Sequence, residues 1–266
     1  MKPTRRAKPL ARAKSDEFNS FVGQQPPATG ELPLTHITDG LGFRGILQTG
    51  ELRPEHCQVF DEPLLYFFYG RPAYRVNSQR LSSAIDAYAP VCLILRPKSL
   101  VVPKRIFPFD SGAFNGDRFA EAMHRKMLLD DFALDVSPET PLRLISLFFG
   151  DCERYYRNIP LEKIEIPPLS FEASSYHVLI TSRHENAFDE RISAIELQSE
   201  GTLDLNSVAE AVVVPDAFAT PDILQRLAAL GITALPYDYI PRLRPESYTG
   251  ALYTIVRDYY RRRGYL

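Results

Sequence analysis

Apolar residues in this chain gather in short runs separated by proline, glycine and polar residues. The strongest runs are PLLYFFY at 63–69, PVCLILRP at 90–97 and SVAEAVVVPD at 207–216. Each has the length and the β-branched or aromatic content of a buried strand. Further strands are predicted at 32–38, 99–103, 175–182 and 192–198.

Two helices are marked by residues that favour helix ends. Asp39 is placed to cap the start of a short helix, and Gly50 is placed to end it. Thr220, Pro221 and Gly231 give the same kind of signal for a second helix. Helical spacing of apolar residues predicts further helical segments at 116–132, 141–158 and 245–263.

The order of these elements points to a fold class. Strands come in groups with helices between them rather than in strict alternation, which favours an α+β fold over a doubly wound sheet. No repeat with a period of 20–50 residues is present, so solenoids and propellers are excluded. The phosphate-binding pattern GxxxxGK[ST] is also absent. We expect one domain over 31–266 that ends in a helix.

Composition narrows the class of protein without naming a partner. The chain has 266 residues, a formal net charge of −2, 45% hydrophobic residues and 24% charged residues, which are ordinary globular values. The near-zero net charge gives no overall attraction to nucleic acid or to a membrane surface. No apolar run approaches the roughly 20 residues of a spanning helix, so we expect a cytoplasmic protein without a membrane partner.

The first 30 residues differ from the rest. Six Lys and Arg residues lie between Met1 and Lys14, followed by polar residues and the stretch GQQPPATG. Such a segment buries too little apolar surface to fold alone, so we expect 1–30 to be a flexible basic tail. The alternative is an arm that contacts phosphate groups of nucleic acid.

Cysteine and histidine spacing gives no metal site. Cys57, Cys92 and Cys152 are far apart and form no CxxC pair, so we expect reduced, buried thiols. No HExxH motif is present. His184 lies beside Glu185, but neighbours on an extended chain point apart. We therefore expect no bound metal.

Three stretches hold the residues that suggest chemistry. His36 lies in LTHITDGLGFRGILQTGELRP, Tyr66 lies in LLYFFYGRPAY, and Glu210 opens the run VAEAVVVPDAF. Their order resembles the His–Tyr–Glu arrangement of ADP-ribosyltransferases of the diphtheria-toxin and poly(ADP-ribose) polymerase lineage. Within that superfamily the stretches look most like the DarT-type toxins that modify DNA. The resemblance implies a split mixed β-sheet with flanking helices, and NAD as co-substrate.

The resemblance also implies roles for particular side chains. Cleavage of the nicotinamide–ribose bond builds positive charge on the ribose, as in glycoside cleavage, and a fixed carboxylate stabilises that charge. Glu210 is the expected catalytic carboxylate, and His36 is expected to bind the adenosine ribose. The other expected NAD contacts are Thr38 in the pocket wall, Tyr66 and Tyr74 against the nicotinamide, and Arg71 at the pyrophosphate.

A second carboxylate competes with Glu210. Gln198 and Glu200 form the Q-x-E pattern of transferases that modify protein side chains, but Glu200 precedes a predicted turn, so we prefer Glu210. The stretch 103–140 is not covered by the resemblance. It could form a loop that contacts the substrate or a local turn stabilised by polar side chains.

The resulting expectation is a mono-ADP-ribosyltransferase that modifies a nucleic acid base or a protein side chain. A toxin or phage-defence role, with a neutralising partner protein, follows only by analogy. Two alternatives stay open. One is a non-catalytic module that binds NAD, ADP-ribose or a protein. The other is an NAD glycohydrolase, with water as the acceptor.

Overall fold

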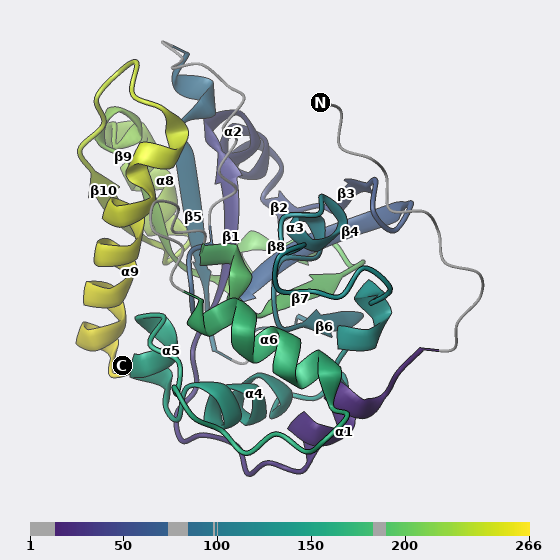
Figure 1. Ribbon diagram of the computed structural model, residues 1–266. Helices are drawn as coiled ribbons and strands as arrows, with labels where there is room; N and C mark the ends of the chain where they lie inside the picture. Colours follow the sequence, from purple (N-terminus) through teal and green to yellow (C-terminus); the bar gives the residue numbers. More distant parts are fainter. Residues whose placement is uncertain (1–13, 74–84, 98, 100, 183–189) are drawn as a thin grey trace. The chain divides into compact units, whose positions relative to one another are not determined.

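The computed structural model describes residues 14–73, 85–97, 99, 101–182 and 190–266 (Figure 1). Strands and helices alternate irregularly along the chain, and an eight-stranded mixed sheet runs in the order β10-β9-β5-β1-β4-β7-β6, with β3 beside β4. Helices flank this sheet, so the predicted α+β class is confirmed. None of the helices in these ranges is both long enough and apolar enough to span a bilayer.

The strands are short. They are β1 (Leu34–Asp39), β2 (Glu51–Leu52), β3 (Glu55–Cys57), β4 (Glu62–Tyr69), β5 (Pro90–Leu95), β6 (Arg105–Phe107), β7 (Glu196–Ser199), β8 (Leu203–Asp204), β9 (Ala209–Pro215) and β10 (Thr233–Tyr237).

Most of the helices are also short. They are α1 (Glu17–Gly23), α2 (Gly40–Thr49), α3 (Ser111–Asn115), α4 (Thr140–Phe148), α5 (Cys152–Tyr156), α6 (Phe171–Thr181), α7 (Leu205–Val208), α8 (Pro221–Ala229) and α9 (Thr249–Arg263). Single 3-10 turns lie at Asp86–Tyr88, Leu129–Phe132, Glu190–Ile192, Asp216–Phe218 and Pro245–Tyr248.

The chain divides into two compact units. Unit 1 comprises Met1–Thr29 and Arg105–Glu196, and unit 2 comprises Gly30–Lys104 and Leu197–Leu266. The segment expected as a single domain, 31–266, thus contributes to both units. Each unit is built from two separate pieces of sequence.

Strands β5 and β9 form the centre of unit 2. Every residue of both strands is buried, which explains why their sequences read as nearly continuous apolar runs. Strand β5 pairs antiparallel with β1 and with β9, and β9 pairs parallel with β10. Strands β9 and β10, which are connected through α8, therefore form a parallel pair, and this pair makes the sheet mixed.

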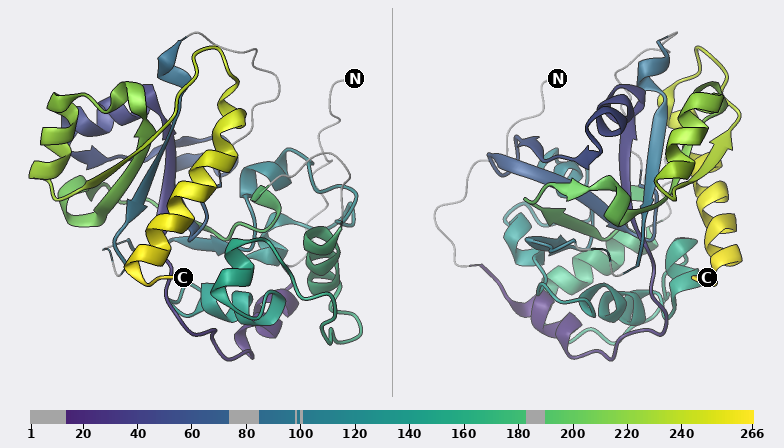
Figure 2. Two further views of the ribbon diagram at one scale, coloured as in Figure 1. Left: turned by 90° about the vertical axis from the view of Figure 1, so that its left-hand side faces the viewer. Right: turned by 180° about the vertical axis from the view of Figure 1, so that it is seen from behind.

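Helices cover both faces of the sheet in unit 2. Helix α9 lies on one face, and α2 and α8 lie on the other (Figure 2). The guanidinium of Arg226 on α8 donates to the backbone carbonyl of Leu47 on α2, which links the two helices of that second face. The sheet is therefore buried from both sides where β9 and β5 run.

Unit 1 has an aromatic core. Phe18 of α1 lies 5.5 Å from Phe132, 6.1 Å from Phe148 and 5.7 Å from Tyr176, measured between ring centroids. Phe109 belongs to the same cluster, because its ring centroid lies 5.1 Å from that of Phe132. The segment 103–140 therefore supplies a large part of this core.

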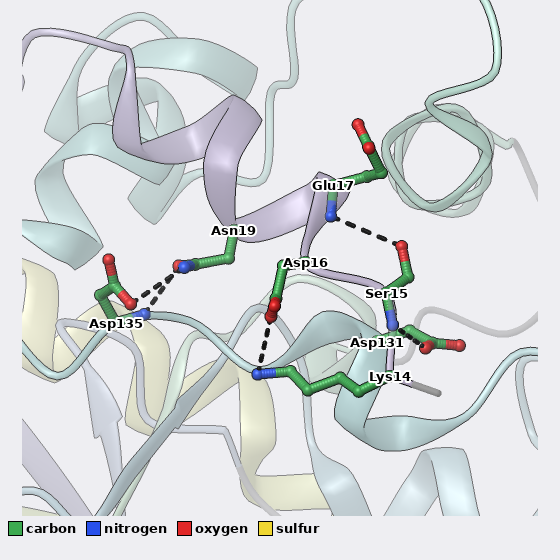
Figure 3. Close-up of polar contacts among 7 residues, drawn as sticks. All are labelled: Lys14, Ser15, Asp16, Glu17, Asn19, Asp131 and Asp135. Carbon is green, nitrogen blue, oxygen red and sulfur yellow. Dashed lines mark hydrogen bonds and ion pairs between the residues drawn. The ribbon is translucent and has the colours of Figure 1, made fainter. Parts of the chain in front are cut away.

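Polar contacts fix α1 in unit 1. The backbone N–H of Ser15 donates to Asp131 Oδ1 at 2.9 Å (Figure 3). Asn19 both donates to and accepts from Asp135, at 2.9 and 2.8 Å. Much of the segment expected as a flexible tail is thus folded, because α1 buries Phe18 completely. Residues 1–13 lie outside the described part of the chain.

Several predicted elements take another form. The strand predicted at 175–182 is wrong, because these residues belong to helix α6 and the bend after it. The helix predicted at 116–132 is wrong as well, since the chain there makes turns and one 3-10 segment, and Asp117 has a φ of 60°. The segment 141–158 forms two helices, α4 and α5, separated at Gly150 with a φ of 89°. The described residues of 99–103 form no strand.

Candidate functional site around His36 and Glu210

His36 lies near the middle of β1 and is half-buried. Its Nδ1 is 2.9 Å from the backbone carbonyl of Tyr66. Because a carbonyl can only accept, Nδ1 carries a hydrogen and donates it. Burial lowers the pKa of His36 below 6.5, so the neutral ring predominates near pH 7. The other nitrogen, Nε2, is then a hydrogen-bond acceptor, which suits a sugar hydroxyl.

Glu210 lies on β9, two strands away from His36 on β1. Strand pairing places His36 beside Leu93 and Leu93 beside Val212, and residues that pair across strands point to one face. Glu210 is two residues before Val212, but the register shift beside it interrupts strict alternation. Its contacts with Tyr259 and Arg263 place its side chain towards α9, whereas Thr38, on the His36 side of β1, meets α2 at Gly42. From standard strand spacings the Cα atoms of His36 and Glu210 are about 12 Å apart.

The sheet is irregular beside Glu210. The register between β5 and β9 shifts between Ile94 and Leu95, opposite the start of β9. Such bulges are frequent next to functional sites because they change the direction of a side chain. This irregularity lies at the strand position that carries the candidate carboxylate.

Three side chains from the C-terminal region hold Glu210. The hydroxyl of Tyr259 donates to Oε1 at 2.7 Å, and Nε of Arg263 donates to Oε1 at 2.8 Å. The hydroxyl of Tyr265 lies 2.9 Å from Oε2 and 3.2 Å from Oε1. Glu210 is 8% exposed. Its carboxylate is thus buried, charge-neutralised and hydrogen-bonded at both oxygens.

The environment of Glu210 also raises the pKa values of its two tyrosine partners. Burial and the hydrogen bond to Glu210 raise the pKa of Tyr259 and of Tyr265 above 10, so both hydroxyls stay protonated as donors at neutral pH. The C-terminal residues were not singled out by their sequence. The spacing of Leu252, Val256 and Tyr259 places Tyr259 on the buried side of α9, but no motif connects it with Glu210.

Tyr66 and Arg71 take positions that differ from their expected roles. Phe67, not Tyr66, faces His36, with ring centroids 5.8 Å apart. Tyr66 therefore points to the opposite face of β4, and its hydroxyl lies 2.6 Å from Cys57 Sγ. Arg71 is fully buried, and its Nε donates to the hydroxyl of Tyr253 on α9 at 3.3 Å. In this form Arg71 is not open to a pyrophosphate.

Thr38 lies on the His36 face, at the turn between β1 and α2. The sequence there, Gly40 to Gly45, has the glycine spacing GxGxxG of dinucleotide-binding folds. That fold needs parallel strands, whereas β1 pairs antiparallel with both of its neighbours. A Cβ on Gly40 would meet the carbonyl of Asp86 at 2.9 Å, and a Cβ on Gly42 would overlap Thr38 Oγ1. These glycines serve close packing within the protein.

The competing carboxylate is arranged differently. Glu200 is exposed, and the ammonium of Lys104 lies 2.6 Å from its Oε2 and 2.7 Å from Glu62 Oε2. Gln198, by contrast, is fully buried. The two side chains of the Q-x-E pattern therefore have separate surroundings.

Some candidate residues lie outside the described part of the chain, namely Tyr74, His184 and Glu185. Among the described residues, no group of three or more His, Cys, Asp or Glu side chains could hold a metal ion. Cys57, Cys92 and Cys152 are free and buried.

No protein-family model and no curated protein sequence matches this chain.

Proposed function

We propose that this protein is an NAD-dependent mono-ADP-ribosyltransferase and that Glu210 is its catalytic carboxylate. The observation that carries the proposal is a buried carboxylate, Glu210, at an irregular strand position, with a neutral histidine, His36, two strands away in the same sheet. A neutral imidazole that accepts a hydrogen bond and a carboxylate are the groups expected at the two ribose rings of NAD.

The reaction needs little covalent chemistry from the protein. The bond between nicotinamide and ribose C1′ breaks, and nicotinamide leaves with the electron pair. The acceptor atom then bonds to C1′ and loses its proton. Glu210 would stabilise the positive charge on the ribose and hold one of its hydroxyls. His36 Nε2 would accept a hydrogen bond from a hydroxyl of the second ribose.

The acceptor is a nucleic acid base or a protein side chain. The DarT-like order of the motifs favours a nucleic acid base. The residue two positions before Glu210 is Val208, so the E-x-E pattern of arginine-modifying enzymes is absent. Arginine is therefore disfavoured as the acceptor.

The first experiment incubates the full chain with NAD labelled on the adenylate and with DNA, RNA or cell lysate as separate acceptors. We expect label on one acceptor class, and its loss in Glu210→Gln, which keeps an acceptor for Tyr259 but removes the charge. Glu200→Gln is the matched control and should keep the activity. If Glu200→Gln lost the labelling activity and Glu210→Gln kept it, the assignment of Glu210 as the catalytic carboxylate would be contradicted.

A second candidate function has its own support. Glu210 is held by three donors and Arg71 is fully buried, as in a module that uses both residues for stability. A non-catalytic binding module predicts neither nicotinamide release nor label on any acceptor. Release of nicotinamide without label would instead identify an NAD glycohydrolase.

A further inference from the structure

Glu210 cannot act in the arrangement described. Three donors lie within 3.2 Å of Oε1, and Tyr265 also contacts Oε2. A carboxylate oxygen has two lone pairs, so Oε1 has no capacity for a ribose hydroxyl. The guanidinium of Arg263 also offsets the negative charge that a cationic ribose would need.

The three donors differ in how firmly they are held. Tyr259 is 5% exposed and lies on the side of α9 that also buries Leu252 and Val256. The Arg263 side chain is 54% exposed, at the last residue of α9. Tyr265 follows Gly264, whose left-handed φ of 75° turns the chain back towards β9. Tyr259 is therefore fixed by the helix, whereas Arg263 and Tyr265 are held mainly by local contacts.

Tyr265 contacts Tyr260, and its side chain also forms a hydrogen bond with Arg263. The N–H of Tyr265 donates to the carbonyl of Tyr260 at 3.0 Å, and its ring packs edge-on against Tyr260 at 5.8 Å. An exposed ion pair such as that of Arg263 adds little stability. Arg263 and Tyr265 can thus move away from Glu210 while the rest of α9 stays folded.

We propose that Arg263 and Tyr265 form a C-terminal latch that holds Glu210 inactive, and that NAD-dependent activity requires the latch to open. After opening, Tyr259 still donates to Oε1 and positions the carboxylate, while Oε2 is free and the charge is no longer offset. This inference rests on the proposed function, because it assigns a regulation to the same carboxylate.

The test compares variants in nicotinamide release at NAD concentrations below saturation. Tyr265→Phe removes the hydroxyl but keeps the ring against Tyr260, and Arg263→Ala removes the cation. Each should raise the rate by about twofold to tenfold, as expected for the loss of one modest contact in the closed form. Arg262→Ala is the matched control, because Arg262 is the exposed neighbour on the same helix turn. Its rate should match that of the unmodified chain.

Two further measurements separate a latch from a structural role. Tyr259→Phe should lower the rate even in the Tyr265→Phe background, because it removes the donor that positions Glu210. Hydrogen exchange at the Tyr265 amide should become faster when NAD is added to the unmodified chain. A merely structural contact predicts no such change.

The outcomes distinguish the two proposals. Unchanged or lower rates in both Tyr265→Phe and Arg263→Ala, with an active unmodified chain, would overturn the latch and leave the transferase assignment in place. Absence of NAD binding and of nicotinamide release in every variant would overturn the proposed function and the latch with it. Higher rates in both latch variants, abolished by adding Glu210→Gln, would support both.

Discussion

A half-buried histidine can be held neutral by its surroundings, and His36 is such a case. Its Nδ1–H is bound to the carbonyl of Tyr66, and burial lowers its pKa. Protonation of the folded protein at this site is therefore harder than protonation of the unfolded chain. The hydrogen-bond acceptor needed at Nε2 exists only in the neutral ring.

This pKa shift predicts acid sensitivity. Below about pH 6.5 the unfolded chain takes up a proton at His36 that the folded protein does not, so the free energy of unfolding falls as the pH falls to the lowered pKa. His36→Gln keeps a donor for Tyr66 and cannot be protonated. Urea unfolding should show that the free energy of unfolding falls less between pH 7.5 and pH 5.5 in the variant than in the unmodified chain. An equal loss in both proteins would assign the acid sensitivity to other groups.

The sequence predicted strands at the candidate residues, but it did not predict which side chains surround them. His36 and Glu210 can be proposed from the sequence because each lies in a short apolar run that predicts a strand. Tyr66 was expected at the candidate site, but Phe67 lies beside His36 instead. Neighbouring residues on a strand point to opposite faces, so an error of one position places the wrong side chain at the site. The contacts of Glu210 with Tyr259 and Tyr265 join residues about 50 positions apart, and no local pattern encodes such a contact.

At the scale of elements, α2 follows its sequence closely. Asp39 Oδ1 accepts from the N–H of Gly42 at 2.9 Å, and Gly50 ends the helix with a φ of 71°. Both end signals were predicted because capping depends on residues within one turn. Glycine in a helix interior normally weakens the helix, so the glycines inside α2 need a separate reason.

The glycines of α2 give a matched pair of substitutions. A Cβ at Gly45 meets nothing within 4 Å, so Gly45→Ala should stabilise the protein by about 0.5–1 kcal/mol. A Cβ at Gly42 would overlap Thr38 Oγ1, so Gly42→Ala should be clearly less stable than Gly45→Ala. Thermal or urea unfolding compares them directly.

A rescue variant checks the cause. Adding Thr38→Ala to Gly42→Ala removes the overlapping atom and should recover stability relative to Gly42→Ala alone. If the two alanine variants unfold at the same denaturant concentration, the close approach of Thr38 does not constrain α2.

Helix α6 shows why other elements were missed. Its buried residues Ala173, Tyr176 and Ile180 follow helical spacing. Phe171 and Val178, however, are 58% and 50% exposed, and these apolar residues on the other side hide the period. The β-branched and aromatic content then resembles a strand. Tertiary packing, not local preference, determines that this segment is a helix.

At the scale of the molecule, the chain passes between the units after Thr29, Lys104 and Glu196. The sequence predicted one domain over 31–266, and it could not reveal units assembled from separate pieces. The aromatic residues of 103–140 gave no sign of a core of their own, because their partners Phe18 and Tyr176 lie far away in the sequence.

The cysteines can report on the two units separately. Cys152 belongs to unit 1, and Cys57 and Cys92 belong to unit 2. Burial and the nearby Asp151 raise the pKa of Cys152 to about 11, and burial raises that of Cys92 further. Since only the thiolate reacts readily, a thiol reagent at pH 8 should modify these two slowly in the native protein and quickly after unfolding.

Mass spectrometry across a urea series shows when each thiol reacts. We expect Cys152 and Cys92 to become reactive at different urea concentrations if the units unfold separately, since two cores need not share one transition. Cys152→Ser provides the control for assigning the signal of unit 1. Reaction of Cys92 in native buffer at the rate of an exposed thiol would contradict its burial.

The position of α1 has a consequence during synthesis of the protein. Ser15 and Asn19 bind Asp131 and Asp135, each 116 residues later in the chain. At about 5–20 residues per second, a ribosome needs roughly 6–23 s to make that intervening stretch. A helix of seven residues is not stable alone in water. Until that stretch has been made, Phe18, Phe21 and Val22 lack the partners that bury them in the folded protein. We expect this apolar segment, once outside the ribosome, to bind chaperones that recognise apolar peptides.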